Sequence, residues 1–183
     1  MDERIVYIGY HGTSNSAAEQ IDKGNFRVTH DRAGWLGSGV YFYQENIENA
    51  KYWAKRKFVN KGRLGGLLRV ELILPKELVF DVTDPLGESN KFYQAVRKRF
   101  VEDEIKKNKL TVKVSNQDDL DGKVFNLICI KNGYRMVRGC TITPDDNDRE
   151  YRLQPHTPNG VELCLRDTRY ISTKEKLCLD GSV

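Results

Sequence analysis

The sequence predicts an α+β fold, in which flanking helices pack on a split, largely antiparallel β-sheet. Many short runs of β-branched and aromatic residues occur along the 183 residues, and only a few stretches of helical periodicity separate them. Hydrophobic residues make up 39% of the chain and charged residues 31%, which is typical of a globular protein that can bury a core. The length predicts one domain, covering residues 1–183.

The expected elements follow from local patterns in chain order. The run from Ile5 to Ile8 is β-branched and aromatic and predicts the first strand, and Ser14 can cap the helix that follows. Apolar residues recur every four positions from Phe92 to Phe100, which predicts a core-facing helix stripe. Polar, turn-forming residues at 143–148 predict an exposed loop. We expect strands at 4–10, 39–43, 67–74, 78–82, 134–142, 150–154, 161–166 and 176–179, and helices near 14–24, 46–60, 89–107 and 119–131.

A polar strand end and a glycine-rich turn are the most informative part of the chain. His11-Gly12-Thr13 follows the first strand run, where a glycine allows a ligand to approach the backbone closely. Glycines precede the second strand run, at 39–43, so the chain that enters it can adopt backbone conformations that other residues cannot. Small residues lie near Tyr41, so its ring should be accessible on one face of the strand. This combination suits a flat heterocycle held between backbone amides and an aromatic ring.

These residues resemble the nicotinamide pocket of the H-Y-E class of ADP-ribosyltransferases, the poly(ADP-ribose) polymerase and diphtheria-toxin type. In that class a second tyrosine stands eleven residues after the first, and Tyr52 stands eleven residues after Tyr41 here. Some members carry an arginine sixteen residues after the histidine, and Arg27 stands sixteen residues after His11. Both spacings agree without a gap inside either of them.

The glutamate of the class opens a late strand. Glu162 stands near the start of the alternating run 161–166, directly after the turn signal Pro158-Asn159-Gly160. Glu71 also lies in an alternating run and is the competing position, since a solvent-facing glutamate is the default for either. The apolar Ile171, nine residues after Glu162, matches the family and favours Glu162.

The resemblance implies a mono-ADP-ribosyltransferase that uses NAD as co-substrate. In the family the glycine clamps the nicotinamide carboxamide, the histidine binds the adenosine ribose, and the two tyrosines stack on the nicotinamide ring. The arginine holds the ribose or pyrophosphate side, and the glutamate bonds the 2′-hydroxyl of the nicotinamide ribose and stabilises the cation that develops there. The implied catalytic residues are His11, Tyr41 and Glu162, and the implied NAD-binding residues are His11, Gly12, Thr13, Arg27, Tyr41, Asn49 and Tyr52. The chain departs from the family at Asn49, often a serine there, and at Arg32 and Trp35, which replace the usual proline-rich donor loop.

The acceptor of ADP-ribose is predicted from charge. From Lys51 to Arg69 the chain carries seven basic residues and no acidic one, interleaved with aromatic residues. Such a stretch can bind phosphates and stack unpaired bases, which slightly favours single-stranded RNA, with Lys55, Arg56, Lys57 and Lys61 as acceptor-binding candidates. A solvated outer face of an amphipathic helix, with Trp53 and Phe58 facing the core, explains the same charges equally well. The sequence is also compatible with a protein side-chain acceptor, an NAD glycohydrolase or a non-catalytic NAD- or RNA-binding module.

Cysteine spacing and hydropathy limit the kinds of site and the cellular location that we expect. The four cysteines, at 129, 140, 164 and 178, have no CxxC spacing and lie in apolar runs, which predicts buried free thiols rather than disulfides or a metal site. No apolar signal region follows Met1, and no stretch reaches the roughly 18 residues of a membrane span, so we expect a cytoplasmic protein with no membrane partner. The layout resembles toxins of bacterial phage-defence systems, which implies an antitoxin or inhibitor protein as a partner.

Overall fold

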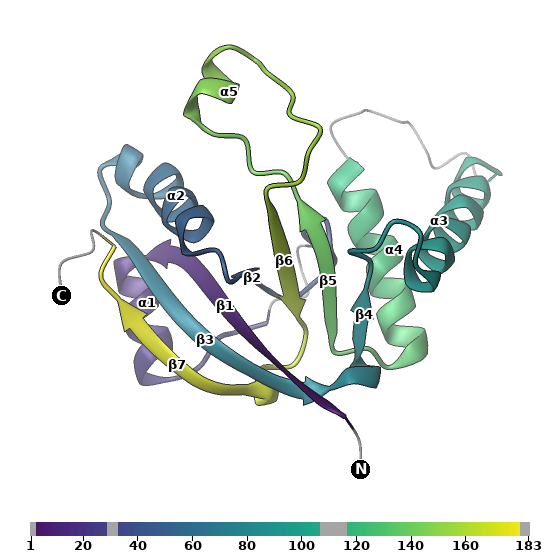
Figure 1. Cartoon of the computed structure of the whole chain (residues 1–183), viewed down its shortest axis with the longest axis horizontal. Coiled ribbons are helices and arrows are strands. Elements are labelled where there is room, and N and C mark those ends of the chain that lie inside the picture. Colours follow the sequence, from purple (N-terminus) through teal and green to yellow (C-terminus); the bar gives the residue numbers. More distant parts are fainter. Residues whose placement is uncertain (1–2, 29–32, 107–116, 180–183) are drawn as a thin grey trace.

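A seven-stranded, mostly antiparallel β-sheet with flanking helices organises the protein, as the sequence predicts (Figure 1). The computed structural model describes residues 3–28, 33–106 and 117–179. The strands are β1 (Arg4–Ser14), β2 (Val40–Gln44), β3 (Gly65–Pro75), β4 (Val79–Asp81), β5 (Met136–Thr141), β6 (Gly160–Leu165) and β7 (Ile171–Leu177). The helices are α1 (Asn15–Lys23), α2 (Ile47–Lys57), α3 (Glu88–Lys106), α4 (Gln117–Asn132) and α5 (Asp146–Glu150), and 3-10 turns occur at η1 (Val59–Lys61), η2 (Lys76–Leu78) and η4 (Thr168–Tyr170).

The sheet opens between β1 and β2. Its strand order is β4-β5-β6-β2-β1-β3-β7, and among neighbouring strands of this sheet the pair β4 and β5 is parallel while the other pairs are antiparallel. The long strands β1 and β3 pair over their whole lengths, whereas β1 and β2 pair only at Gly9 with Gln44 and at Tyr10 with Tyr43. Figure 1 shows β1, β3 and β7 diverging from β6, β5 and β4 across this weak junction.

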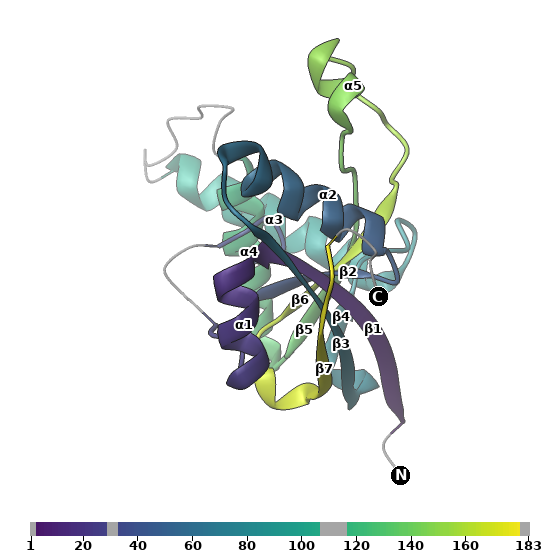
Figure 2. The same cartoon turned by 90° about the vertical axis from the view of Figure 1, so that its left-hand side faces the viewer.

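Helices cover both faces of the sheet. A Cβ at Gly65 would contact Ala54 of α2, whereas a Cβ at the next residue, Gly66, would contact Ala18 of α1. Because successive strand residues point to opposite faces, α1 and α2 lie on opposite faces of the sheet. One buried cluster contains Ala18 and the inner face of β3, and a second contains residues of α3, α4 and β5. Figure 2 shows α5 projecting away from the sheet on a long connection.

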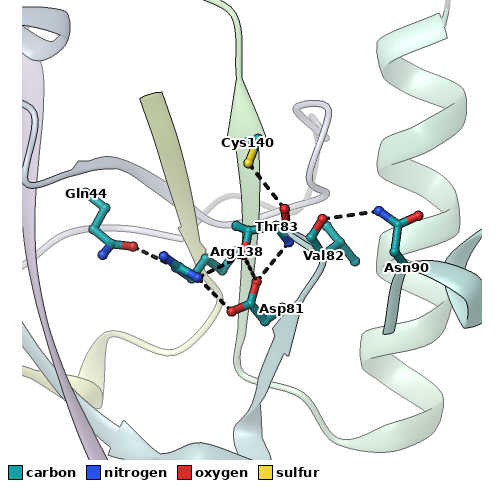
Figure 3. Close-up of polar contacts among 7 residues, drawn as sticks. All are labelled: Gln44, Asp81, Val82, Thr83, Asn90, Arg138 and Cys140. Carbon is teal, nitrogen blue, oxygen red and sulfur yellow. Dashed lines mark hydrogen bonds and ion pairs between the residues drawn. The ribbon is translucent and has the colours of Figure 1, made fainter. Parts of the chain in front are cut away.

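A polar cluster holds the edge strand β4 in register (Figure 3). The Arg138 Nη1 of β5 donates to Oδ2 of its register partner Asp81 at 2.8 Å and to the Thr83 hydroxyl at 2.9 Å. Its Nε donates to Oε1 of Gln44 in β2 at 2.7 Å, which spans the intervening strand β6. Asn90 of α3 donates to the carbonyl of Val82 at 3.2 Å, so the helix is tied to the same strand end. Side-chain bonds therefore add to the short backbone ladder between β4 and β5.

Two strand predictions were wrong. Residues 150–154 form no strand, because Asp145 and Asp148 make a reciprocal capping box that begins α5 at Asp146. The last strand was expected at 176–179 but runs over 171–177, where it pairs with β3. β7 is an edge strand, and exposed edges commonly carry lysine and other polar side chains. Its polar residues therefore lack the apolar alternation by which strands are predicted.

The remaining local predictions have mixed outcomes. The Ser14 side chain caps α1 by accepting from the N–H of Ala17 at 3.2 Å, which confirms that prediction. The predicted stripe of α3 is correct for Val96 and Phe100, which pack against the second buried cluster, but Phe92 is 44% exposed and Tyr93 is buried instead. Cys140 and Cys178 are exposed, so the buried-thiol prediction is correct only for the other two cysteines. None of the helices in the described part of the chain is long and apolar enough to cross a membrane.

Candidate functional site

A cleft of about 1190 Å³ lies where β1 and β2 part. Its walls come from the strands β1, β2, β5 and β6, the helices α1, α2 and α4, the segments 24–27 and 33–35, and the connection between β5 and β6. Of the residues predicted to bind NAD or its acceptor, those that line the cleft are His11, Gly12, Arg27, Tyr41, Tyr52, Arg56 and Glu162. The fold thus brings together side chains that are as far as 151 positions apart in the sequence.

The backbone of Gly12 lies without a strand partner on the side of the cleft. The Glu45 N–H donates to the Ile8 carbonyl at 3.0 Å, and continuing that ladder would place Gly12 opposite Tyr41. In an antiparallel ladder alternate residues direct their N–H and C=O to the same neighbour, so Ile8, Tyr10 and Gly12 all face β2. The described pairing of β1 and β2 ends at Tyr10. The peptide groups of Gly12 are therefore directed into the opening, where an amide ligand can pair with them.

Gly12 also has a packing role that the sequence did not indicate. A Cβ at this position would lie 2.1 Å from the carbonyl oxygen of Ala50 and 3.1 Å from the nitrogen of Ala54. The backbones of β1 and α2 therefore touch here, and glycine is required whether or not a ligand binds.

His11 bridges the two strands where their ladder stops. Its Nδ1 donates to the carbonyl oxygen of Tyr41 at 2.8 Å, so that nitrogen carries the proton. The rings of Phe26 and Phe42 meet the imidazole edge-on, with centroids 5.3 and 5.8 Å away. Burial lowers the pKa of His11, and the bond to the Tyr41 carbonyl opposes this only partly. The ring is thus held neutral with Nε2 as an acceptor.

The hydroxyl of Tyr41 anchors the turn that precedes β2. It donates to the carbonyl of Gly37 at 2.8 Å and accepts from the N–H of Leu36 at 2.9 Å. A Cβ at Gly34 would lie 2.4 Å from the Tyr41 oxygen, so glycine lets the ring lie against the turn. Burial raises the pKa of Tyr41 far above its usual value, so it acts as a neutral ring and a hydrogen-bonding strut, not as a base.

Glu162 enters the same cleft from β6. Its register partners are Tyr43 of β2 and Gly139 of β5. Its Oε2 accepts from the indole Nε1 of Trp35 at 2.9 Å. Burial raises the pKa of Glu162, and hydrogen bonds from Trp35 and Thr141 oppose the rise without cancelling it. The carboxylate is therefore a stronger proton acceptor than a solvent-exposed glutamate.

The opposite wall combines α2 with the arm formed by residues 142–159. The Tyr52 hydroxyl donates to Oδ1 of Asp146 at 2.9 Å and accepts from Nε of Arg149 at 3.2 Å. Trp53 also lines the cleft and is 37% exposed, with the Lys57 ammonium 4.8 Å from its ring centroid. The expectation that Trp53 faces the core is therefore wrong.

Positive charge predominates on the walls of the cleft. Arginines contribute three lining side chains, at positions 27, 56 and 149, against the two carboxylates of Asp121 and Glu162. This balance suits a ligand with more than one negative charge.

Other predicted residues lie elsewhere. Thr13 and Asn49 do not line the cleft, and the Asn49 side-chain amide approaches the carbonyl of Asn159 at 3.5 Å. Glu71 lies in β3 opposite Ile8 and Thr173, away from the cleft. Lys55, Lys57 and Lys61 are exposed on α2 and η1 without lining it. Arg32 falls outside the described residues.

Sequence reasoning missed three contributors to the site. Tyr43 lines the cleft opposite Glu162, and burial together with the nearby Glu162 carboxylate raises its pKa to about 12. Arg149 comes from the arm, and Trp35 holds the glutamate. No local pattern could have found them, because each acts through a contact with a segment about 100 residues away.

Comparison with known proteins assigns no family to the chain. No family model matches it. A stretch of 79 residues is 34% identical to an uncharacterized protein of Methanocaldococcus jannaschii. The aligned region covers 40% of this chain and 36% of that protein, so the chain matches little more than a third of its relative's length.

Proposed function

We propose that the protein is an NAD-dependent mono-ADP-ribosyltransferase, which breaks the nicotinamide–ribose bond of NAD and transfers ADP-ribose to a macromolecule. The observation that carries the proposal is that His11, Tyr41 and Glu162 line one cleft at an opening in the sheet. The resemblance in sequence requires these residues to meet, yet they come from three strands and none is close to another in the chain. The arginine-rich lining also suits the pyrophosphate of NAD.

In this proposal, the opening in the sheet receives the nicotinamide. The carboxamide pairs with the N–H and C=O of Gly12, and the pyridine ring lies beside Tyr41 and Tyr52, which both line the cleft. The neutral His11 accepts a hydrogen bond from a ribose hydroxyl through Nε2. Arg27 is exposed at the cleft wall and binds the ribose or pyrophosphate side.

Glu162 then stabilises the reacting ribose. The carbon–nitrogen bond breaks with both electrons leaving on nicotinamide, and positive charge develops on the ribose, as in glycoside cleavage. The Glu162 carboxylate accepts the 2′-hydroxyl hydrogen bond and offsets that charge, which a buried group does more effectively than an exposed one. An acceptor oxygen attacks the same carbon and releases its proton to solvent.

For the acceptor, the exposed surface of α2 favours single-stranded RNA. Trp53 offers an exposed indole at the cleft, and Lys57 lies over its ring. Arg56 lines the cleft beside it, and Lys55 and Lys61 add further exposed positive charge. An aromatic platform flanked by cations can stack a base while binding its phosphates. A protein side chain, or water in an NAD glycohydrolase, would accept the ADP-ribose without using this platform.

The first test removes the charge of Glu162. In Glu162→Gln we expect NAD affinity to stay within a few-fold while turnover of NAD falls by roughly 10²–10³, the usual loss for one electrostatic contact in a transition state. Glu71→Gln is the matched control, because Glu71 lies outside the cleft, and its turnover should equal that of the wild type. Turnover in Glu162→Gln comparable to the wild type would reject the proposed function.

The second test concerns the acceptor. Reversing Lys55, Lys57 and Lys61 to glutamate spares every residue that lines the cleft, so hydrolysis of NAD without acceptor should be almost unchanged. Transfer to RNA should collapse in this variant, and wild-type transfer should fall steeply between roughly 50 and 200 mM salt as counterion release weakens. Incubation with labelled NAD and separate RNA and protein pools gives the readout. Label in the protein pool, insensitive to salt, would reject RNA and favour a side-chain acceptor.

A further inference from the structure

We infer that Trp35 is the positioning residue for the Glu162 carboxylate, acting through its indole N–H from a turn that the fold clamps on two sides. The inference rests on the proposed function for its catalytic meaning, although the contact itself stands on geometry. Trp35 Nε1 donates to Glu162 Oε2 at 2.9 Å across 127 positions of sequence. A carboxylate on a flexible side chain can rotate, and a fixed donor on one oxygen directs the other oxygen.

The sheet makes room for the indole beside Glu162. Gly139 is the register partner of Glu162 on β5, and a Cβ there would lie 2.8 Å from Cη2 of Trp35. The ring therefore lies across β5, at the register position that faces the glutamate. Trp35 lines both the main cleft and an adjacent cavity of about 350 Å³, so its indole forms part of the wall between them.

Backbone and side-chain bonds hold the turn that carries Trp35. Gly34 and Gly37 exchange N–H···O bonds of 2.9 and 3.1 Å, and the Tyr41 hydroxyl bonds to Leu36 and Gly37 within the same turn. Tyr41, which is proposed to lie beside the nicotinamide ring, is thereby bonded to the turn whose Trp35 holds Glu162.

A second clamp comes from α4 and the end of β6. Asn126 Oδ1 accepts from the N–H of Ser38 at 2.8 Å, and its Nδ2 donates to the Ser38 hydroxyl at 3.0 Å. Arg166 Nη1 donates to the Ser38 carbonyl at 2.9 Å and to Asn126 Oδ1 at 2.6 Å. These contacts give the tryptophan the rigid support that an orienting residue requires.

The contact has a consequence for the protonation of Glu162. An N–H donor stabilises the ionised carboxylate, so it opposes the effect of burial. Removing the donor while keeping an aromatic ring should therefore raise the pKa of Glu162 and free the carboxylate to rotate. If the tryptophan only fills space, replacement by the smaller phenylalanine should leave that pKa unchanged or lower it, because Glu162 becomes less buried.

The decisive experiment is an NMR titration of Glu162. The chain contains two tryptophans, so the wild type should give two indole N–H resonances, and Trp53→Phe assigns them. We expect the Trp35 indole resonance to shift with the protonation of Glu162 and to lose this shift in Glu162→Gln. In Trp35→Phe, a labelled Glu162 carboxyl should titrate at higher pH than in the wild type. The inference would be overturned if the Trp35 indole resonance did not respond to the protonation of Glu162. It would also be overturned if Glu162 titrated in folded Trp35→Phe as it does in the wild type.

Turnover supplies an independent readout. In Trp35→Phe we expect kcat for NAD cleavage to fall by roughly 10- to 100-fold, as is usual on loss of an orienting partner, with the acidic limb of the pH profile moved to higher pH. Tyr134→Phe is the matched control, because it also removes a hydrogen-bond donor from an aromatic side chain, but Tyr134 lies against Phe80, outside both cavities. Its kcat and pH profile should equal those of the wild type. Absence of NAD turnover in the wild type would reject the proposed function, while the titration would still decide whether Trp35 holds Glu162.

Discussion

Replacing Gly12 by alanine should loosen the contact between β1 and α2. The new Cβ would lie 2.1 Å from the carbonyl oxygen of Ala50, more than 1 Å closer than ordinary van der Waals contact allows. Both nearby groups, in Ala50 and Ala54, belong to the backbone of α2, so no side-chain rotation relieves the overlap. Overpacking usually costs about 1–3 kcal/mol, and a backbone obstacle places Gly12→Ala near the upper end, at about 3 kcal/mol. For a chain of this size the corresponding fall in Tm is about 6–12 °C.

Differential scanning calorimetry measures this effect without any assumption about function. Thr13→Ala is the control, because the next residue of β1 points to the other face of the sheet and should change stability by about 1 kcal/mol or less. A Gly12→Ala protein that melts within about 2 °C of the wild type, or together with Thr13→Ala, would refute the proposed backbone contact.

Three further predictions concern the polar contacts. Arg138→Met removes the hydrogen bonds from β5 to Asp81, Thr83 and Gln44, so the unfolding free energy measured in urea should fall by about 2 kcal/mol. Lys91→Met is the control, because it removes an exposed ion pair with Glu88 and should change the unfolding free energy by about 0.5 kcal/mol or less. Burial favours a higher pKa for Asp81, but the hydrogen bonds from Thr83 and Arg138 outweigh burial and lower the pKa. The stability that the ionised Asp81 contributes is therefore present above about pH 4 and is lost as the pH falls further. In Asp81→Asn, the unfolding free energy should depend less on pH in this acidic range. Tyr52→Phe loses the hydrogen bonds to Asp146 and Arg149, so amide hydrogen exchange within residues 145–151 should become faster while Tm stays nearly constant. Unchanged exchange rates would show that other contacts hold the arm.

Local sequence patterns predicted most of the elements. The run from Ile5 to Ile8 and the cap at Ser14 correctly placed the starts of β1 and α1, because strand composition and capping act over a few neighbouring residues. The expected end of β1 at residue 10 was wrong, since the strand continues to Ser14 along β3. The same reasoning missed most of β7, whose polar edge residues have no strand-like alternation to detect. It also missed α5, where a capping box outweighed the expectation of an exposed loop.

The sequence by itself determined the fold class and identified seven of the residues that line the cleft, since strand patterns and residue spacings are properties of short stretches of chain. Only the tertiary structure decided that β1 and β2 part before Gly12, and that Gly12 touches α2. The tertiary structure alone also paired Trp35 with Glu162, at a separation of 127 residues. Strand register and close packing set these contacts, and both depend on how distant segments fit together, so no window of sequence contains them.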